Sequence, residues 1–245
     1  MRNLKVRCCY DGSGFYGFQL QPHHRTVAGE LNRALSELFC EEVKVIGCSR
    51  TDSGVHAKEF LFSVRTNSAV PCENIVRAMS TMLTPEIGIY DCMEMPSDFH
   101  PRIDCKRKTY SYRIWNSRQP NPFLRGRALF YPFPLDEEAL NKAAAEFLGE
   151  HDFSAFMSSG SQIKTRVRTV LESSVHREDR EVVFTVCATG FLYNMVRIMV
   201  GTLLEIAEGK ISLSDISGII KSKDRHTAGR TAPAEGLYLE RVYYD

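Results

Sequence analysis

The sequence predicts an α+β fold in which strands and helices follow one another twice in the order β-α-β-β-α-β. Two patterns carry this prediction: apolar residues alternate with polar ones in short segments, and elsewhere they recur at helical spacing. Residues 98–106 interrupt both patterns and separate the two cycles. The order is that of the ferredoxin-like unit. We therefore expect two such units, residues 1–102 and 103–245, in one continuous antiparallel sheet with a cleft at their junction.

The first cycle begins with a strand whose alternating residues Leu4, Val6, Cys8 and Tyr10 bury one face. A loop follows Asp11, and helical spacing starts at Thr26. Pro71 suits the first turn of a second helix, because its missing amide hydrogen is not needed there. The expected strands are residues 3–10, 43–46, 60–64 and a segment from 87, and the expected helices are 26–40 and 71–82.

The second cycle repeats the order with one additional helix and without a sequence repeat of fixed period. The strands are expected at 109–115, 168–176, 181–188 and 237–243, and the helices at 135–148, 191–207 and 214–221. Residues 116–134 are rich in proline and arginine, which predicts a loop.

Composition is that of a globular protein, with 245 residues, 43% of them hydrophobic and 25% charged. Its apolar stretches are shorter than the ~18–20 residues of a membrane span. The first residues run directly into the strand pattern rather than into the apolar block of a signal peptide. These features predict a cytoplasmic protein.

The eight cysteines show neither a C-x-x-C motif nor a Cys/His spacing typical of zinc sites. Most lie in apolar runs, so we expect reduced, buried thiols and no metal. Net charge is only +1, but basic residues cluster at 106–108, 164–168 and 221–230. Such clusters are compatible with an RNA-binding face and equally with separate solvated surfaces.

One loop between two expected strands combines a cation, a carboxylate and an imidazole: Arg50, Asp52 and His56. It can be read as a polar turn in which Asp52 bonds its own backbone. It can also be read as a reactive site, since loops held by rigid strands often carry function. A single placed carboxylate without a metal-ligand cluster suits nucleophilic catalysis by aspartate.

Residues 50–57 read Arg-Thr-Asp-Ser-Gly-Val-His-Ala, which closely resembles the signature loop of the tRNA pseudouridine synthase A family. Six further segments resemble the same family in the same order. They are Tyr10–Gln19, Arg25–Val27 followed by Glu30 and Leu31, Phe99–Arg102 then Lys108–Tyr112, His151–Phe156 before Arg166–Thr169, Phe191–Arg197 with Val200–Leu203, and Thr231–Leu237. Three positions depart from the family pattern: Phe18 replaces a usual Trp, Ser49 a frequent Gly, and Asn194 a commoner His.

The resemblance implies that Asp52 is a nucleophile that lets the base of a target uridine detach, rotate and rejoin through carbon. It implies that Arg50 occupies the vacated space and that Tyr110 packs against the base. It pairs Arg197 with Asp52, which would keep the carboxylate ionised. From its apolar surroundings alone, Arg197 could instead extend its charge to solvent.

The implied substrate is tRNA, at uridines 38–40 of the anticodon stem-loop, bound in the cleft between the units by a homodimer without cofactors. Phosphate contacts are expected from basic residues of both units: Arg102, Lys108, Arg166 and Arg168. The alternative class is a non-catalytic RNA-binding module, which has no need for Asp52 near phosphates. A small-molecule enzyme is a third reading, for which no cofactor motif is present.

Overall fold

The computed structural model describes residues 1–160 and 163–245 of the chain. Its contacts divide the chain into two compact units, Met1–Lys106 with Tyr238–Asp245, and Arg107–Leu237. The sequence placed the boundary between residues 102 and 103 and the final strand in the second part. The contacts assign residues 238–245 to the first unit, because strand β10 (Leu237–Tyr243) pairs with β3 (His56–Thr66) there.

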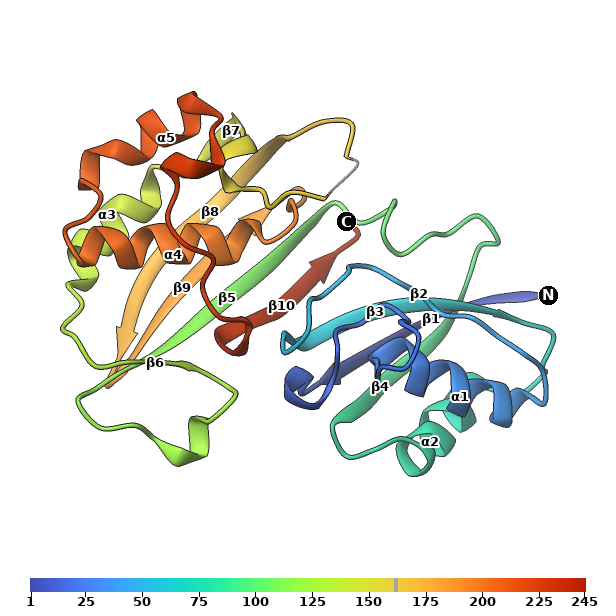
Figure 1. Cartoon of the computed structure of the whole chain (residues 1–245). Helices are drawn as coiled ribbons and strands as arrows, with labels where there is room; N and C mark the ends of the chain where they lie inside the picture. Colours follow the sequence, from blue (N-terminus) through green and yellow to red (C-terminus); the bar gives the residue numbers. More distant parts are fainter. Residues whose placement is uncertain (161–162) are drawn as a thin grey trace. The chain divides into compact units, whose positions relative to one another are not determined.

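The first unit is built on a mostly antiparallel sheet in the order β4-β1-β3, with β10 parallel to β3. Strand β1 spans Arg2–Tyr10 and β4 spans Ile87–Met95. The predicted alternation along β1 is confirmed: Leu4, Val6, Cys8 and Tyr10 are all buried. Helices α1 (Val27–Phe39) and α2 (Cys72–Met82) lie side by side on one face of the sheet (Figure 1).

Side-chain caps explain where α1 begins and why the next strand is short. Thr26 Oγ1 accepts a hydrogen bond from the Gly29 amide at 3.2 Å, which satisfies one of the first-turn donors. The predicted strand at 43–46 is reduced to β2, Ile46–Gly47. The amides of Val43 and Val45 donate instead to Ser36 and Asn32 of α1, so they are not available to a strand ladder.

The second unit is a mostly antiparallel sheet in the order β5-β9-β8-β7 with two helices on one face (Figure 1). Its large aromatic side chains Phe147, Phe153, Phe156 and Phe184 are fully buried. The strands are β5 (Arg107–Asn116), β6 (Leu129–Tyr131), β7 (Gly149–Asp152), β8 (Val167–Glu178) and β9 (Glu181–Ala188), and the helices are α3 (Glu137–Ala145), α4 (Met195–Ala207) and α5 (Ile216–Ser222). Both units therefore confirm the predicted α+β class.

Three details of this unit differ from the prediction. The expected 116–134 loop contains β6, which pairs in parallel with the end of β5, and β7 was not foreseen. Helix α4 begins at Met195 rather than near Phe191, because Asn194 has a φ of 61°. That left-handed conformation cannot continue a right-handed helix.

All eight cysteines are thiols rather than disulfides, but only Cys8, Cys48 and Cys187 are buried. Cys40, the C-cap residue of α1, is exposed, and the other four are half-buried. The expectation of buried thiols is thus correct for three positions only. Among the described residues, no helix combines the length and the apolarity needed to cross a membrane.

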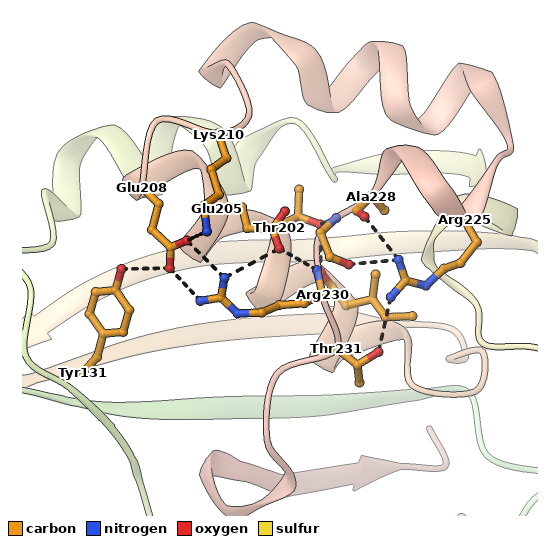
Figure 2. A network of polar contacts seen from close by, with 11 residues as sticks. Tyr131, Thr202, Glu205, Glu208, Lys210, Arg225, Ala228, Arg230 and Thr231 are labelled. Carbon is orange, nitrogen blue, oxygen red and sulfur yellow. Dashed lines mark hydrogen bonds and ion pairs between the residues drawn. The ribbon is translucent and has the colours of Figure 1, made fainter.

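The segment 225–232 runs along α4 at very close range (Figure 2). A Cβ atom on Gly201 would lie 1.7 Å from the Arg230 carbonyl oxygen, so the approach requires glycine. Thr202 Oγ1 accepts from the Gly229 amide at 3.0 Å, and Glu205 accepts from the Arg230 amide at 2.9 Å. These bonds fix the segment to the helix by its backbone.

A carboxylate at the end of α4 secures the same segment through side chains. Glu208 accepts two hydrogen bonds from the Arg230 guanidinium, at 2.6 and 3.1 Å, and a third from the Tyr131 hydroxyl at 3.2 Å. Lys210 adds an ion pair at 2.7 Å. The bonds from Arg230 and then Lys210 lower the pKa of Glu208 to about 2.

We expect Glu208→Gln to lower the free energy of unfolding at pH 7 by up to about 1 kcal/mol, since Arg230 is partly exposed and screened. A carboxyl whose pKa falls on folding stabilises above its unfolded pKa of about 4.3 and loses that effect as pH drops towards 2. The difference from the unmodified protein should therefore narrow below pH 4.5 in urea unfolding. Glu172→Gln, on an exposed residue of β8, is the control; a difference that does not depend on pH would contradict this account.

Candidate active site and RNA interface

The Asp52 loop, residues 48–55, connects β2 to β3 and has no regular secondary structure. Its shape is set by the N-terminal loop, residues 11–19. The Phe18 amide donates to the Thr51 carbonyl at 3.1 Å, and the Gly54 amide donates to the Phe15 carbonyl at 3.2 Å. Within this frame Asp52 is half-buried, and its carbonyl accepts from the Val55 amide at 3.2 Å. The two neighbouring residues differ, because Thr51 is buried and Arg50 is exposed.

Two glycines allow the N-terminal loop to approach the Asp52 loop backbone to backbone. A Cβ atom on Gly12 would lie 1.9 Å from the Val55 carbonyl oxygen. Gly17 has a φ of +83°, and a Cβ there would lie 2.5 Å from the Thr51 carbonyl oxygen. Neither position can hold a larger residue without moving the loop that carries Asp52.

The His56 side chain is buried and contacts the N-terminal loop rather than solvent. It is only 2% exposed, and its ring stacks on Tyr238 with centroids 4.5 Å apart. Its Nδ1 lies 3.1 Å from the Gly12 amide and 3.2 Å from Asp11 Oδ1. Nδ1 can donate or accept a hydrogen bond but cannot do both. Because the Gly12 amide can only donate, Nδ1 accepts from it. The sequence grouped His56 with Arg50 and Asp52 as reactive groups, whereas the structure makes it a structural residue.

Arg197 lies on α4 in the second unit, half-buried and held in place. Its Nε donates to the Ala232 carbonyl at 2.8 Å, and its Nη1 donates to Asn194 Oδ1 at 2.9 Å. Asn194 in turn donates from Nδ2 to Ser158 Oγ at 2.9 Å. Arg197 therefore does not extend to solvent, which was one of the two sequence interpretations. Asn194, seen in the sequence only as a departure from the family, orients this guanidinium.

Tyr110 and Tyr112 are neighbours on the same face of β5 but differ in their environment. Tyr110 is 7% exposed and meets Phe191 edge-on, with ring centroids 4.9 Å apart. Tyr112 is fully buried and donates its hydroxyl to the Pro233 carbonyl at 2.8 Å. Burial raises the pKa of Tyr112 well above its usual value. Tyr112 is a core residue, and Tyr110 borders the surface.

The four basic residues expected to contact phosphates differ in their exposure and in their hydrogen bonds. Arg102, in the first unit, and Arg166, in the second, are exposed. Lys108 is half-buried at the start of β5. Arg168 is half-buried, and its Nη1 donates to the carbonyls of Thr165 and Val167 at 3.1 and 2.6 Å. Burial lowers the pKa of Arg168, although an arginine stays charged at neutral pH.

A cavity of about 270 Å³ adjoins the Asp52 loop within the first unit. Arg50 and Arg102 both line it, and neither forms an ion pair within residues 1–160 and 163–245. Sequence reasoning missed this cavity because its walls come from distant segments. The lining residues are Phe18, Gln19, Leu20, Ala28, Asn32, Lys44, Val45, Ile46, Gly47, Ser49, Arg50 and Arg102.

In the part of the chain that the structure describes, no group of three or more His, Cys, Asp or Glu side chains is arranged to hold a metal ion. The polar side chains that the family resemblance points to are Asp52 and Arg50 in the first unit and Arg197 and Tyr110 in the second.

Gly12→Ala should destabilise the protein by about 1–3 kcal/mol, the usual cost of forcing a methyl group into a packed site. Gly14→Ala, in the same turn, is the matched control: its Cβ would meet only side-chain ends, Arg25 Nη1 at 3.2 Å and Glu86 Oε1 at 3.7 Å. Thermal unfolding of both variants measures the difference. Equal melting temperatures would show that the two loops do not depend on this contact.

Comparison with known proteins identifies the relatives of this chain. Residues 143–245 match a family model described as tRNA pseudouridine synthase. Proteins named tRNA pseudouridine synthase A are 48% identical in Acetivibrio thermocellus and 43% identical in Clostridium acetobutylicum, each over the full length of both chains. A relative of the same name in Staphylococcus aureus is 38% identical over 99% of this chain and 92% of its own length. The chain thus belongs to the tRNA pseudouridine synthase A family and is an isomerase that forms pseudouridine in tRNA.

Proposed function

We propose that this enzyme isomerises uridines 38–40 in the anticodon stem-loop of tRNA, with Asp52 as the nucleophile. The observation that carries the proposal is the placement of Asp52 in a loop whose backbone is fixed by the neighbouring N-terminal loop. A nucleophile held in this way needs little reorganisation when it reacts. The close likeness of residues 50–57 to the family's signature loop supports the same assignment.

The reaction conserves atoms and electrons. The bond between C1′ and N1 of the uridine breaks, the base rotates, a bond forms between C1′ and C5, and the proton on C5 is replaced by one on N1. Asp52 forms a covalent bond to the substrate, either at the ribose or at the base, that holds one fragment while the base turns; this bond breaks again as the product forms, which regenerates the carboxylate. No oxidant or reductant is required, which agrees with the expectation that the enzyme uses no cofactor.

Arg197 is proposed to pair with Asp52 and to keep its carboxylate ionised, because a nearby cation favours the charged form. The bonds of Arg197 to Asn194 and Ala232 support this role. Both acceptors are neutral, so these two bonds fix the guanidinium without neutralising its charge.

Chemistry on a base requires removing it from the stack. We propose that Arg50 occupies the space that the base leaves and that Tyr110 packs against the extruded base. The exposure of Arg50 and the position of Tyr110 at the border of the core are compatible with these roles. Arg102, Lys108, Arg166 and Arg168 are proposed to contact phosphates.

We also propose that residues 1–102 and 103–245 are two ferredoxin-like domains of one continuous sheet with the RNA in a cleft between them, strand β10 of the second domain pairing with β3 of the first. The order β4-β1-β3 with β2 beside β3 supports this for the first unit. We propose further that the enzyme is a homodimer and works in the cytoplasm.

Asp52→Asn should abolish pseudouridine formation, lowering the rate at least about a thousandfold, because an amide is not a nucleophile here. Binding of tRNA should persist or tighten, since a negative charge near phosphates is removed. Unmodified tRNA transcripts, mapped by carbodiimide treatment and primer extension, give both the rate and the modified positions. Asp98→Asn, on an exposed residue of the same unit, is the control. Product formation by Asp52→Asn at the unmodified rate would refute the nucleophile assignment.

Arg197→Leu should lower the rate about a hundredfold, on the scale of one lost electrostatic contact in an active site. The melting temperature should fall by only a few degrees, because the side chain is half-buried and loses two hydrogen bonds. Arg197→Lys keeps the positive charge but cannot form both hydrogen bonds in the same geometry. Its rate should therefore lie between those of the unmodified protein and the Leu variant. Full activity of the purified Leu variant on tRNA would exclude the proposed pairing.

A further inference from the structure

The cavity beside the Asp52 loop combines apolar walls with two cations. Phe18 is buried and stacks on Phe60 with ring centroids 4.4 Å apart, so its position is fixed. Leu20 and Ile46 are 57% and 39% exposed, which is unusual for large apolar side chains that share one cavity. Ala28 and Val45 extend the same apolar lining. The cavity therefore offers a hydrophobic surface of suitable size for a flat ring.

The charges at this cavity are not balanced by acids. Arg50 and Arg102 are exposed, lie 52 residues apart in sequence, and have no carboxylate partner in the described part of the chain. Lys44, also in the lining, pairs only with Glu42, at 3.5 Å, and both side chains are largely exposed. No carboxylate belongs to the lining. Like charges that converge without counterions favour a site for an anion.

An apolar surface for stacking next to arginines for phosphate is the chemistry by which proteins hold single-stranded nucleotides. The polar amides of Gln19 and Asn32 lie in the same lining and can bond the edge of a base. A nucleotide uses all three parts of the cavity, whereas a free anion would use only its cations and a lipid tail only its walls.

We propose that this cavity binds one nucleotide of the tRNA next to the uridine that is isomerised. The proposal rests on the proposed function, since it assumes that Asp52 marks the reacting nucleotide. Asp52 is not part of the lining, so the base in the cavity is not the one that reacts. Arg50, which lines the cavity, lies two residues before Asp52 in the sequence, so their Cα atoms are at most about 7 Å apart. This spans about two stacked bases at 3.4 Å each, so the nucleotide is an immediate neighbour or the next one.

Two variants test the cavity with tRNA. Leu20→Trp fills it from an exposed position and should raise the KM for tRNA about tenfold with kcat nearly unchanged, the scale of one lost stacking contact. Met93→Trp, on exposed β4 outside the cavity, is its control. Arg102→Gln should reduce the slope of log K against log salt by about one, as expected for one lost phosphate contact. Arg77→Gln, an exposed arginine on α2 in the same unit, should leave the slope unchanged.

A direct measurement identifies the ligand without turnover. Amide NMR shifts of Ile46, Gly47 and Ser49 are followed while uridine 5′-monophosphate, uridine or inorganic phosphate is added to the unmodified protein. Uridine 5′-monophosphate should shift these signals at lower concentration than either part alone, and Leu20→Trp should suppress the shifts. Equal shifts with phosphate or with uridine, or none with any of the three, would overturn the nucleotide site.

The outcomes separate this inference from the proposed function. If Asp52→Asn retains activity, the nucleophile assignment fails whatever the cavity binds. If Asp52→Asn is inactive while Leu20→Trp keeps the unmodified KM, only the cavity proposal fails. Thermal unfolding of each variant confirms that it is folded before its kinetics are compared.

Discussion

The first unit depends on the backbone contact between the N-terminal loop and the loop that carries Asp52. The Asp52 loop has no helix or strand of its own, so its conformation is determined by what it packs against. Gly12 and Gly17 allow the two backbones to touch, and amide bonds at Phe18 and Gly54 close both sides of the contact. His56 then fills the space beneath. A carboxylate in a loop is thereby held with the rigidity of an element of regular structure.

In the second unit, the side chain of Arg197 is likewise held by hydrogen bonds. Arg197 is oriented by Asn194 on its own helix and by the Ala232 carbonyl from the segment 225–232. That segment is irregular after the short 3-10 turn Arg225–Thr227. It lies close to α4 because Gly201 has no side chain, and the bonds to Thr202 and Glu205 hold it there. In each unit a glycine allows a segment to approach closely, and hydrogen bonds then hold the backbone of that segment. The acceptors are backbone carbonyls in the first unit and the side chains of Thr202 and Glu205 in the second.

Much of the fold was predictable because periodicity reports burial. The strands around Val6 and Phe62 and the helix after Thr26 lie where alternation and helical spacing place them. The short β2 was not predictable, since the side chains of Ser36 and Asn32 take its amide donors. The local sequence pattern also could not reveal that Asn194 has a left-handed backbone conformation or that His56 is buried. Those depend on contacts between segments far apart in sequence.

The charge distribution explains how a chain of net charge +1 can be suited to RNA. Its arginines differ in whether a carboxylate lies beside them. Those with carboxylate partners stabilise the fold and contribute little field: Arg2, Arg7, Arg25, Arg33, Arg113, Arg177 and Arg230. Arg50, Arg102, Arg166 and Arg168 have no such partner in the described residues. Phosphate contacts act over about one Debye length, roughly 8–10 Å in physiological salt, so we expect local unpaired charges of this kind to affect RNA binding more than the overall balance does.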